Sequence, residues 1–260
     1  MKFTEYTVSN GNFGRNITFA VISDLHGNSP EAPLKLLEKA RPDYILAPGD
    51  IFEPMNGTHK EINEAGFALL SGASKIAPTF FSPGNHEVGG IGSWRPGWTP
   101  QSSKEKYSAE ELQKLYQTGV HFLDDSYKIY DGIAFGGLAS GLIRPDRKPE
   151  CTWLDGFFAQ KLPKVLLCHH PEYYEEYIKS SDTDLIVSGH AHGGQWRIFG
   201  RGVFAPGQGL FPKYTSGVHD NRFVISTGLK KGIPIPRFFN PPEVVAIRVI
   251  CTSPQKGERS

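Results

Sequence analysis

Two histidines stand one residue apart in the stretch Asp184 to Gln195, DLIVSGHAHGGQ. A short apolar run that stops at Gly189 is typical of a buried strand ending at a tight turn, which brings His190 and His192 to the end of a sheet. Imidazole is a common ligand of first-row transition metals. Taken alone, the pair fits a metal site and a pair of hydrogen-bonded turn histidines equally well, because histidine is often a satisfied polar side chain.

Four earlier apolar runs also end on polar residues. Asp24 and His26 follow the run Ile17–Ile22, and Asp50 follows the run Asp43–Ala47. Asn85 and His86 follow the run Pro78–Ser82, and His169 and His170 follow the run Lys164–Cys168. Helical patterns at residues 30–40 and 60–75 separate the first three runs, which gives a βαβαβ alternation. In open α/β sheets, ligands bind at the carboxyl ends of the strands. The alternation therefore predicts one shared site.

The remaining elements are expected around this framework. Helices are predicted at residues 106–118 and 172–180, and strands at residues 134–138, 222–227 and 243–250, the last two antiparallel and finishing a second sheet. The segment from Glu87 to Tyr107 interrupts the alternation, and its Trp94 and Trp98 indicate either a binding loop at the rim or a small satellite core. The polar tail from Thr252 is expected to fray.

The composition is that of an ordinary globular protein. With 38% hydrophobic and 21% charged residues, the 260-residue chain is predicted to form a single domain over residues 1–260. A net charge of +1 gives no bulk attraction to nucleic acid, which is not expected as a dedicated partner. Cys151, Cys168 and Cys251 form no C-x-x-C pair and are expected to be reduced thiols. Without an apolar leader or membrane-spanning stretch, a cytoplasmic protein is expected.

The collected polar residues exceed what one metal ion needs. Carboxylate, imidazole and carboxamide ligands in this number suit two divalent ions about 3.5–4 Å apart that share a carboxylate. Such a pair would clamp phosphoryl oxygens and lower the pKa of a bridging water, so that the resulting hydroxide attacks phosphorus in line. The set therefore predicts phosphoester hydrolysis.

Five motifs follow one another in the chain: D-x-H at Asp24, GD at Gly49, GNHE at Gly84, H-x-P at His169 and GHAH at Gly189. In this order, and after apolar strands, they resemble the motifs of the calcineurin-like metallophosphoesterases. The resemblance covers residues 17–192. It implies an α/β fold in four layers, an αββα sandwich of two mixed sheets.

The resemblance also implies a role for each matched position. Asp24, His26 and His192 would hold one metal ion, Asn85, His169 and His190 the other, and Asp50 would bridge them. His86 would be the catalytic histidine, which stabilises phosphoryl oxygens and protonates the departing alkoxide, with Glu53 as its pKa partner. His170 would lie at the rim or behind the ligands. The two divalent ions are expected to be Mn, Fe, Zn or Ni.

One position departs from the pattern of the phosphoprotein phosphatases, because Pro54 follows Glu53 where that branch has an arginine. The departure favours a small-molecule phosphodiester or pyrophosphate substrate. The blocks APGQGLFPKYTSG and IPRFFNPPE resemble a bacterial branch that includes membrane-associated phosphodiesterases and a UDP-diacylglucosamine pyrophosphatase. The apolar stretch Phe199 to Tyr214 is either a loop packed over the sheet edge or a wall for a lipid or base. Arg197, Arg201 and Lys213 are candidates to meet a second phosphate.

Two alternatives remain beside a dinuclear phosphodiesterase. One is a non-catalytic metal-binding scaffold on the same fold. The other is a lipid-linked pyrophosphatase at the membrane surface, with peripheral lipid contact. The sequence predicts neither the physiological substrate nor the oligomeric state.

Overall fold

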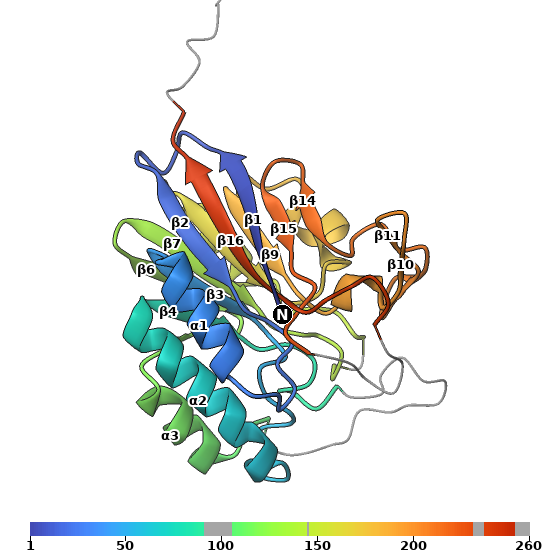
Figure 1. Ribbon diagram of the computed structural model, residues 1–260. Helices are drawn as coiled ribbons and strands as arrows, with labels where there is room; N and C mark the ends of the chain where they lie inside the picture. The colour runs from blue at the N-terminus through green and yellow to red at the C-terminus, as the bar shows by residue number, and fades with distance from the viewer. Residues whose placement is uncertain (91–105, 145, 231–236, 253–260) are drawn as a thin grey trace, which may run out of the picture.

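Two six-stranded sheets lie face to face in the computed structural model, which describes residues 1–90, 106–144, 146–230 and 237–252 (Figure 1). The first sheet has the order β1-β16-β2-β3-β4-β5 and the second the order β14-β15-β9-β8-β7-β6. Helices cover both outer faces, so the predicted αββα sandwich of two mixed sheets is confirmed.

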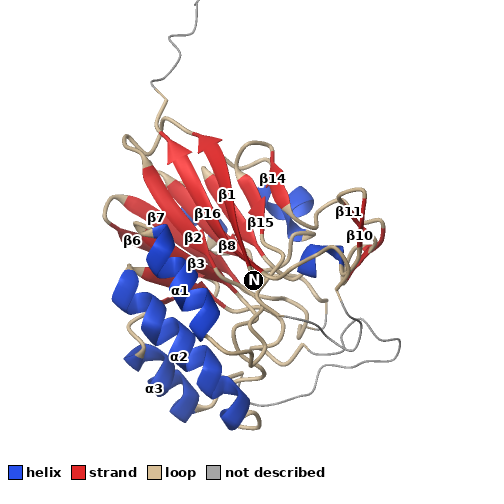
Figure 2. Ribbon diagram, viewed as in Figure 1, coloured by secondary structure: helices blue, strands red, loops and turns tan. Residues whose placement is uncertain are grey.

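The first sheet and its helices come mainly from the N-terminal half. Their bounds are β1 Lys2–Ser9, β2 Ile17–Val21, α1 Glu31–Ala40, β3 Tyr44–Pro48, α2 Lys60–Ile76, β4 Thr79–Ser82, α3 Ala109–Gln117, β5 His121–Phe122 and β16 Glu243–Ile250. Figure 2 shows α1, α2 and α3 side by side along one side of the molecule. Leu37 of α1 and Leu70 of α2 pack with Ile45 of β3 in this helical layer. The helical patterns at residues 30–40 and 60–75 are therefore confirmed.

The second sheet follows in the chain. Its elements are β6 Ser126–Tyr130, β7 Ile133–Leu138, α4 Leu154–Phe158, β8 Lys164–Cys168, η1 Tyr174–Ile178, β9 Leu185–Ser188, β14 Gly217–His219 and β15 Phe223–Ile225. The fourth layer is thin, because the helix predicted at residues 172–180 is only one π-helical turn, η1. The Tyr174 ring of that turn stacks on Phe223 with ring centroids 4.3 Å apart, which holds the short turn against the sheet.

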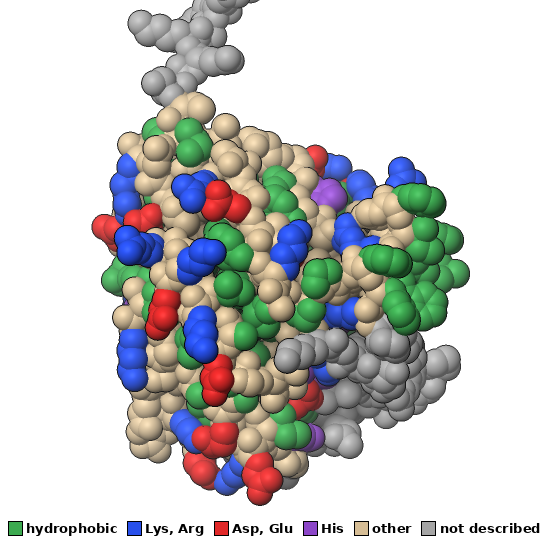
Figure 3. Space-filling model, in the orientation of Figure 1, with side chains coloured by type: hydrophobic (Ala, Val, Ile, Leu, Met, Phe, Trp, Pro, Cys, Tyr) green, Lys and Arg blue, Asp and Glu red, His purple; other side chains and the backbone are tan. Residues whose placement is uncertain are grey.

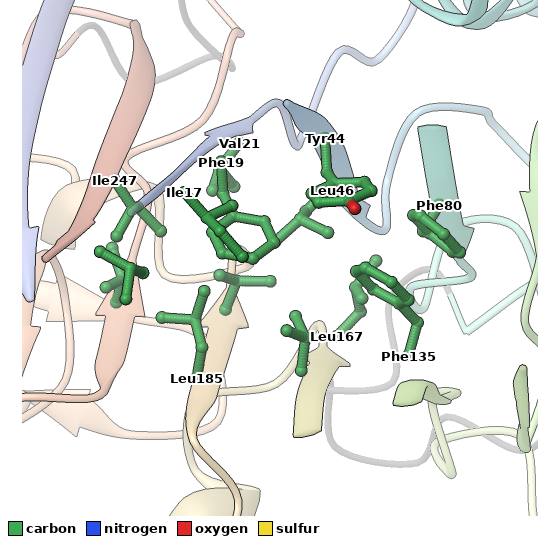
Figure 4. Packing of buried hydrophobic residues seen from close by; sticks show 14 of the residues in the cluster. Ile17, Phe19, Val21, Tyr44, Leu46, Phe80, Phe135, Leu167, Leu185 and Ile247 are labelled. Carbon is green, nitrogen blue, oxygen red and sulfur yellow. The ribbon is translucent and has the colours of Figure 1, made fainter. Parts of the chain in front are cut away.

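The core between the sheets is built from large apolar side chains of both (Figure 4). Phe80 of β4 and Phe135 of β7 stack with their ring centroids 3.7 Å apart and their planes 10° from parallel. Because both rings are fully buried, this contact fastens the two sheets to each other directly.

One predicted strand belongs to the other sheet. We expected residues 243–250 to finish the second sheet, but β16 pairs in parallel with β1 and antiparallel with β2 in the first sheet. Val244 faces the helical layer while Val245 and Ile247 face the inter-sheet core, so the strand is apolar on both faces, as a central strand must be. The strand predicted at residues 222–227 does belong to the second sheet, where β15 pairs antiparallel with β14 and parallel with β9.

The parallel pairing brings the ends of six strands to one edge. β2, β3 and β4 run parallel in the first sheet, and β7, β8 and β9 run parallel in the second. Small elements lie beyond β9: η2 His192–Gly194, β10 Arg197–Ile198, β11 Arg201–Gly202, β12 Phe204–Ala205 and β13 Gly209–Leu210. β10 and β11 form one hairpin, and β12 and β13 form another.

Trp94, Trp98 and the tail from residue 253 onward lie outside the described residues. In the described ranges, none of the helices has the length and apolar character needed to cross a membrane.

Candidate metal centre

The loops after β2, β3, β4, β8 and β9 bring the predicted site residues together. Two groups of buried side chains offer ligand atoms within 4.8 Å of one another, namely Asp24, His26 and His192, and Asp50, His169 and His190. The two groups meet at Asp50, because its Oδ2 lies 3.1 Å from Nε2 of His169 and 3.6 Å from Nε2 of His26.

Backbone hydrogen bonds hold the loops in register. The amide of Leu25 donates to the carbonyl of Asp50, and the amide of Asp24 donates to the carbonyl of Gly49. The carboxylates also bind backbone, because Oδ1 of Asp24 accepts from the amide of His190 and Oδ1 of Asp50 accepts from the amide of His86. One oxygen of each carboxylate therefore orients a neighbouring loop, and Oδ2 of Asp50 faces the histidines of the cluster.

Several buried polar atoms here lack a hydrogen-bond partner among the described residues. They are Oδ2 of Asp24, Nε2 of His26, Oδ1 of Asn85 and Nε2 of His169. Buried polar atoms are normally paired, and leaving one unpaired costs about 1–3 kcal/mol. All four are lone-pair donors that suit divalent metal ions, and they occur in both groups. These residues therefore fit a pair of metal ions.

Two histidines have hydrogen-bond acceptors at Nδ1, the ring nitrogen that points away from the cluster. Nδ1 of His169 lies 2.7 Å from the carbonyl of Pro48, and Nδ1 of His26 lies 3.2 Å from Oε1 of Glu53. Each acceptor places the proton on Nδ1 and leaves the Nε2 lone pair directed into the cluster. This is the arrangement usual for metal-binding histidines.

His86 shares the Glu53 carboxylate with His26. Nδ1 of His86 lies 2.8 Å from Oε2 of Glu53, which directs Nε2 toward Asp50 at 3.9 Å. The His86 side chain is 21% exposed, whereas that of His26 is 1% exposed. His86 is thus the imidazole that an incoming molecule can reach.

The charges of this cluster reinforce one another. Burial alone would raise the pKa of Asp50 and of Glu53, but the surrounding histidines outweigh it and lower both pKa values. Burial opposes protonation of His86, but Asp50 and Glu53 raise the pKa of its imidazole above the ordinary value. The arrangement therefore favours two carboxylates beside a protonated His86.

Five of the predicted ligands have a left-handed backbone. They are Asp24 (φ 56°), His26 (φ 47°), Asp50 (φ 53°), His190 (φ 64°) and His192 (φ 45°). Such conformations are uncommon outside glycine and cost about 1–3 kcal/mol each. Their concentration on one cluster is the mark of a functional site. Sequence patterns do not reveal it.

Sequence reasoning missed a buried glutamate that shapes the centre. Glu87 accepts hydrogen bonds from the amides of Asp50, Ile51, Phe52 and Gly84, and so ties the two loops after β3 and β4 together. Its place as the last residue of GNHE was the available signal.

Two residues of the C-terminal segment were missed as well. Nη2 of Arg237 lies 3.1 Å from Nδ1 of His192, and Nδ2 of Asn240 donates to the carbonyls of His192 and Gln195. The block IPRFFNPPE contains both residues, but nothing in its spacing predicts contact with the metal loop.

His170 is buried rather than at the rim. Its Nε2 lies 2.8 Å from Oγ of Ser140 and its Nδ1 lies 3.2 Å from Oε1 of Glu172. The same carboxylate oxygen lies 3.8 Å from Nε2 of His190. His170 therefore lies behind the ligand cluster, packed against His190 with ring centroids 4.3 Å apart.

The segments beside the metal loop expose large apolar side chains, which Figure 3 shows gathered where β10 and β11 lie in Figure 1. We call Phe199, Leu210, Phe211 and Phe239 the apolar rim. Phe199 is fully exposed, and the exposed fractions of Phe239, Phe211 and Leu210 are 91%, 77% and 71%. Of the two alternatives for Phe199 to Tyr214, a loop packed over the sheet edge does not describe the exposed Phe199, Leu210 and Phe211, although Tyr214 is buried.

Two of the three cations expected to meet a second phosphate already have protein partners. Arg197 donates to the carbonyls of Gly193 and Gly200 and to Ser216, and so braces its own hairpin. Lys213 forms an ion pair with Glu175 at 2.6 Å.

The chain was compared with known proteins. The family model for calcineurin-like phosphoesterases matches residues 17–194. Phosphodiesterase YaeI of Escherichia coli is 27% identical over 189 residues, which are 68% of this chain and 61% of YaeI. An uncharacterized metallophosphoesterase of Helicobacter pylori is 23% identical over 91% of this chain and 60% of its own length. The chain thus spans about three-fifths of either relative.

Among solved structures, TT1561 of Thermus thermophilus is similar. Its TM-score is 0.42 at 17% identity, over 66% of this chain and 81% of that one.

Proposed function

Because the chain belongs to the calcineurin-like phosphoesterase family, we propose that it hydrolyses a phosphodiester or pyrophosphate bond with the help of two divalent metal ions. The observation that carries the proposal is the pair of buried ligand groups that meet at Asp50. Both groups contain donor atoms without a hydrogen-bond partner among the described residues. Asp24, His26 and His192 would hold one ion, Asn85, His169 and His190 the other, and Asp50 both. The ions would be Mn, Fe, Zn or Ni.

Bound ions would neutralise charge on the phosphoryl oxygens and lower the pKa of a coordinated water. The protein would supply the proton for the other end of the reaction. His86 is the accessible imidazole, and Glu53 and Asp50 favour its protonated form. Its Nε2 would therefore donate a proton to the departing alkoxide, while Glu53 keeps the ring oriented through Nδ1.

The test compares hydrolysis of bis-p-nitrophenyl phosphate with that of p-nitrophenyl phosphate by metal-stripped protein resupplied with manganese. Asp50→Asn and His86→Ala should each lower kcat for the diester by about 100-fold or more. His59→Ala is the matched control, because His59 is only half-buried, stands at the start of α2 and belongs to neither ligand group. If folded, metal-loaded protein cleaves neither ester, the non-catalytic scaffold becomes the better explanation.

A second candidate is cleavage of a lipid-linked pyrophosphate or phosphodiester at a membrane surface, which the apolar rim favours. Phenylalanine and leucine tips that project from neighbouring loops suit insertion into the headgroup region of a bilayer. The charge pattern agrees, because residues 189–219 contain no Asp or Glu, and Arg197 and Arg201 lie there without an ion pair to a carboxylate of the described residues, whereas Lys213 pairs with Glu175. An anionic bilayer would therefore meet both apolar and cationic groups beside the metal loop.

Flotation with vesicles tests this candidate. The protein should float with vesicles of phosphatidylglycerol and phosphatidylcholine, and the triple variant Phe199→Ser, Phe211→Ser, Phe239→Ser should not. The double variant Ile62→Ser, Ile129→Ser is the control, because these side chains are 47% and 50% exposed on α2 and β6, away from the rim. Equal flotation of both variants would contradict insertion of the apolar rim.

A further inference from the structure

A largely buried guanidinium lies against the metal loop. Nη1 of Arg237 donates to the carbonyl of Thr227 at 2.7 Å, and Nη2 lies 3.1 Å from Nδ1 of His192. Its Nε is buried and without a hydrogen-bond partner in the described ranges, and no carboxylate there forms an ion pair with this arginine. An arginine side chain does not lose its proton in proteins, so this positive charge has only the more distant carboxylates of Asp24 and Glu243 to balance it among the described residues.

The contact with His192 depends on an unligated ring. A guanidinium only donates hydrogen bonds, so Nδ1 of His192 must be the acceptor. A histidine that ligates through Nε2 carries its proton on Nδ1, and one that ligates through Nδ1 has no lone pair left there. In either case Nη2 of Arg237 loses its acceptor when His192 is a ligand. It then joins Nε as a donor without a partner.

A second cation lies on the same segment. The amide of Leu229 donates to the carbonyl of Ser23, and a Cβ built on Gly228 would lie 2.8 Å from Oδ2 of Asp24. The segment therefore packs directly on the first ligand group. Lys230 follows it and is close enough to act electrostatically on His26. Arg237 and Lys230 thus place two positive charges on the His26 and His192 side of the centre.

We propose that Arg237 is the anion-binding element of the site and binds non-bridging oxygens of a phosphoryl group. A planar guanidinium with freed Nε and Nη2 donors matches two oxygens of one phosphate. The position after Glu53 offers no cation for this task, because it is Pro54. The proposal rests on the proposed phosphoesterase function and names the residue that would recognise the substrate's phosphate.

Inorganic phosphate is the probe. Its binding to the metal-loaded 260-residue chain is measured by titration calorimetry, with metal content determined on the same samples. Arg237→Gln should weaken phosphate binding by about 10-fold or more, because a charge-assisted bidentate contact is lost. Arg237→Lys keeps the charge without the fork and should give an intermediate loss. Arg248→Gln, which removes an exposed arginine of β16 that pairs with Glu5, should leave the affinity unchanged.

Three outcomes separate the possibilities. If Arg237→Gln binds phosphate as tightly as the wild type, the proposal is overturned. If that variant also loses metal, Arg237 only positions His192. If the wild type binds no phosphate at millimolar concentrations, the proposal also fails. If binding depends on Arg237 but no ester is cleaved, the anion site stands and the proposed hydrolysis falls. Should Arg237→Gln not fold, Arg237→Lys decides between the same outcomes.

Discussion

Nδ1 of His86 lies 2.8 Å from Oε2 of Glu53, and this contact joins the reachable imidazole of the centre to a carboxylate with a depressed pKa. Burial works against a charged His86, but Asp50 and Glu53 raise its pKa above the ordinary value. A proton donor with a raised pKa is active below that pKa and is lost as the pH rises through it.

Glu53→Gln should therefore move the alkaline limb of the kcat profile to lower pH. The substitution removes one of the charges that hold the proton on His86, so its pKa falls. The profile of diester cleavage against pH gives the measurement. Glu64→Gln, which alters an exposed carboxylate paired with Lys114, is the control. An unmoved limb would mean that His86 is not the group that titrates there.

Gly84→Ala should remove metal from the centre. A Cβ at Gly84 would lie 2.3 Å from Oδ1 of Asp50 and 2.8 Å from Cδ2 of His169, so the carboxylate must move. Metal content after dialysis should fall well below that of the wild type. Gly156→Ala is the matched control, because its Cβ would meet Tyr127 at an ordinary 3.7 Å. Full metal content in Gly84→Ala would show that Asp50 is not a required ligand.

Phe135→Ala should lower the free energy of unfolding by about 3–5 kcal/mol, because it removes a fully buried ring stacked on Phe80. Urea denaturation of the metal-free protein measures the change. Ile129→Ala on the neighbouring strand β6 removes a half-exposed side chain and should cost less than about 1 kcal/mol. Similar losses for both variants would argue against a tightly packed interface between the sheets.

Metal removal should lower the thermal midpoint. Only the folded chain brings both ligand groups together, so a metal ion at 100 times its Kd should stabilise the protein by about 2.7 kcal/mol. Thermal melts with manganese and with a chelator give the comparison. Asp50→Asn should gain less from manganese than the wild type. A midpoint that does not respond to metal in the wild type would contradict a metal centre at these residues.

The sequence predicted the framework of the site well, and the reason is local. The strand ends before Asp24, Asp50, Asn85, His169 and His190 are marked by apolar runs and turn residues, and parallel strands bring such ends to one edge. The fold class followed from the same alternation and from the resemblance.

What the sequence did not predict depends on pairing between distant segments. β16 is placed by neighbours from the start of the chain, and Arg237 by a contact with His192 that no spacing rule encodes. The left-handed backbone at five site residues is imposed by the surrounding loops rather than by local preference.

The position of β16 between β1 and β2 also determines when the first sheet can form during synthesis of the chain. While residues 243–250 are still inside the ribosome, β1 has no strand beside it and β2 has one open edge. The first sheet is therefore completed only when residues 243–250 have emerged. A nascent chain stalled before that point carries an unpaired strand edge, which is the kind of surface that chaperones must shield from aggregation.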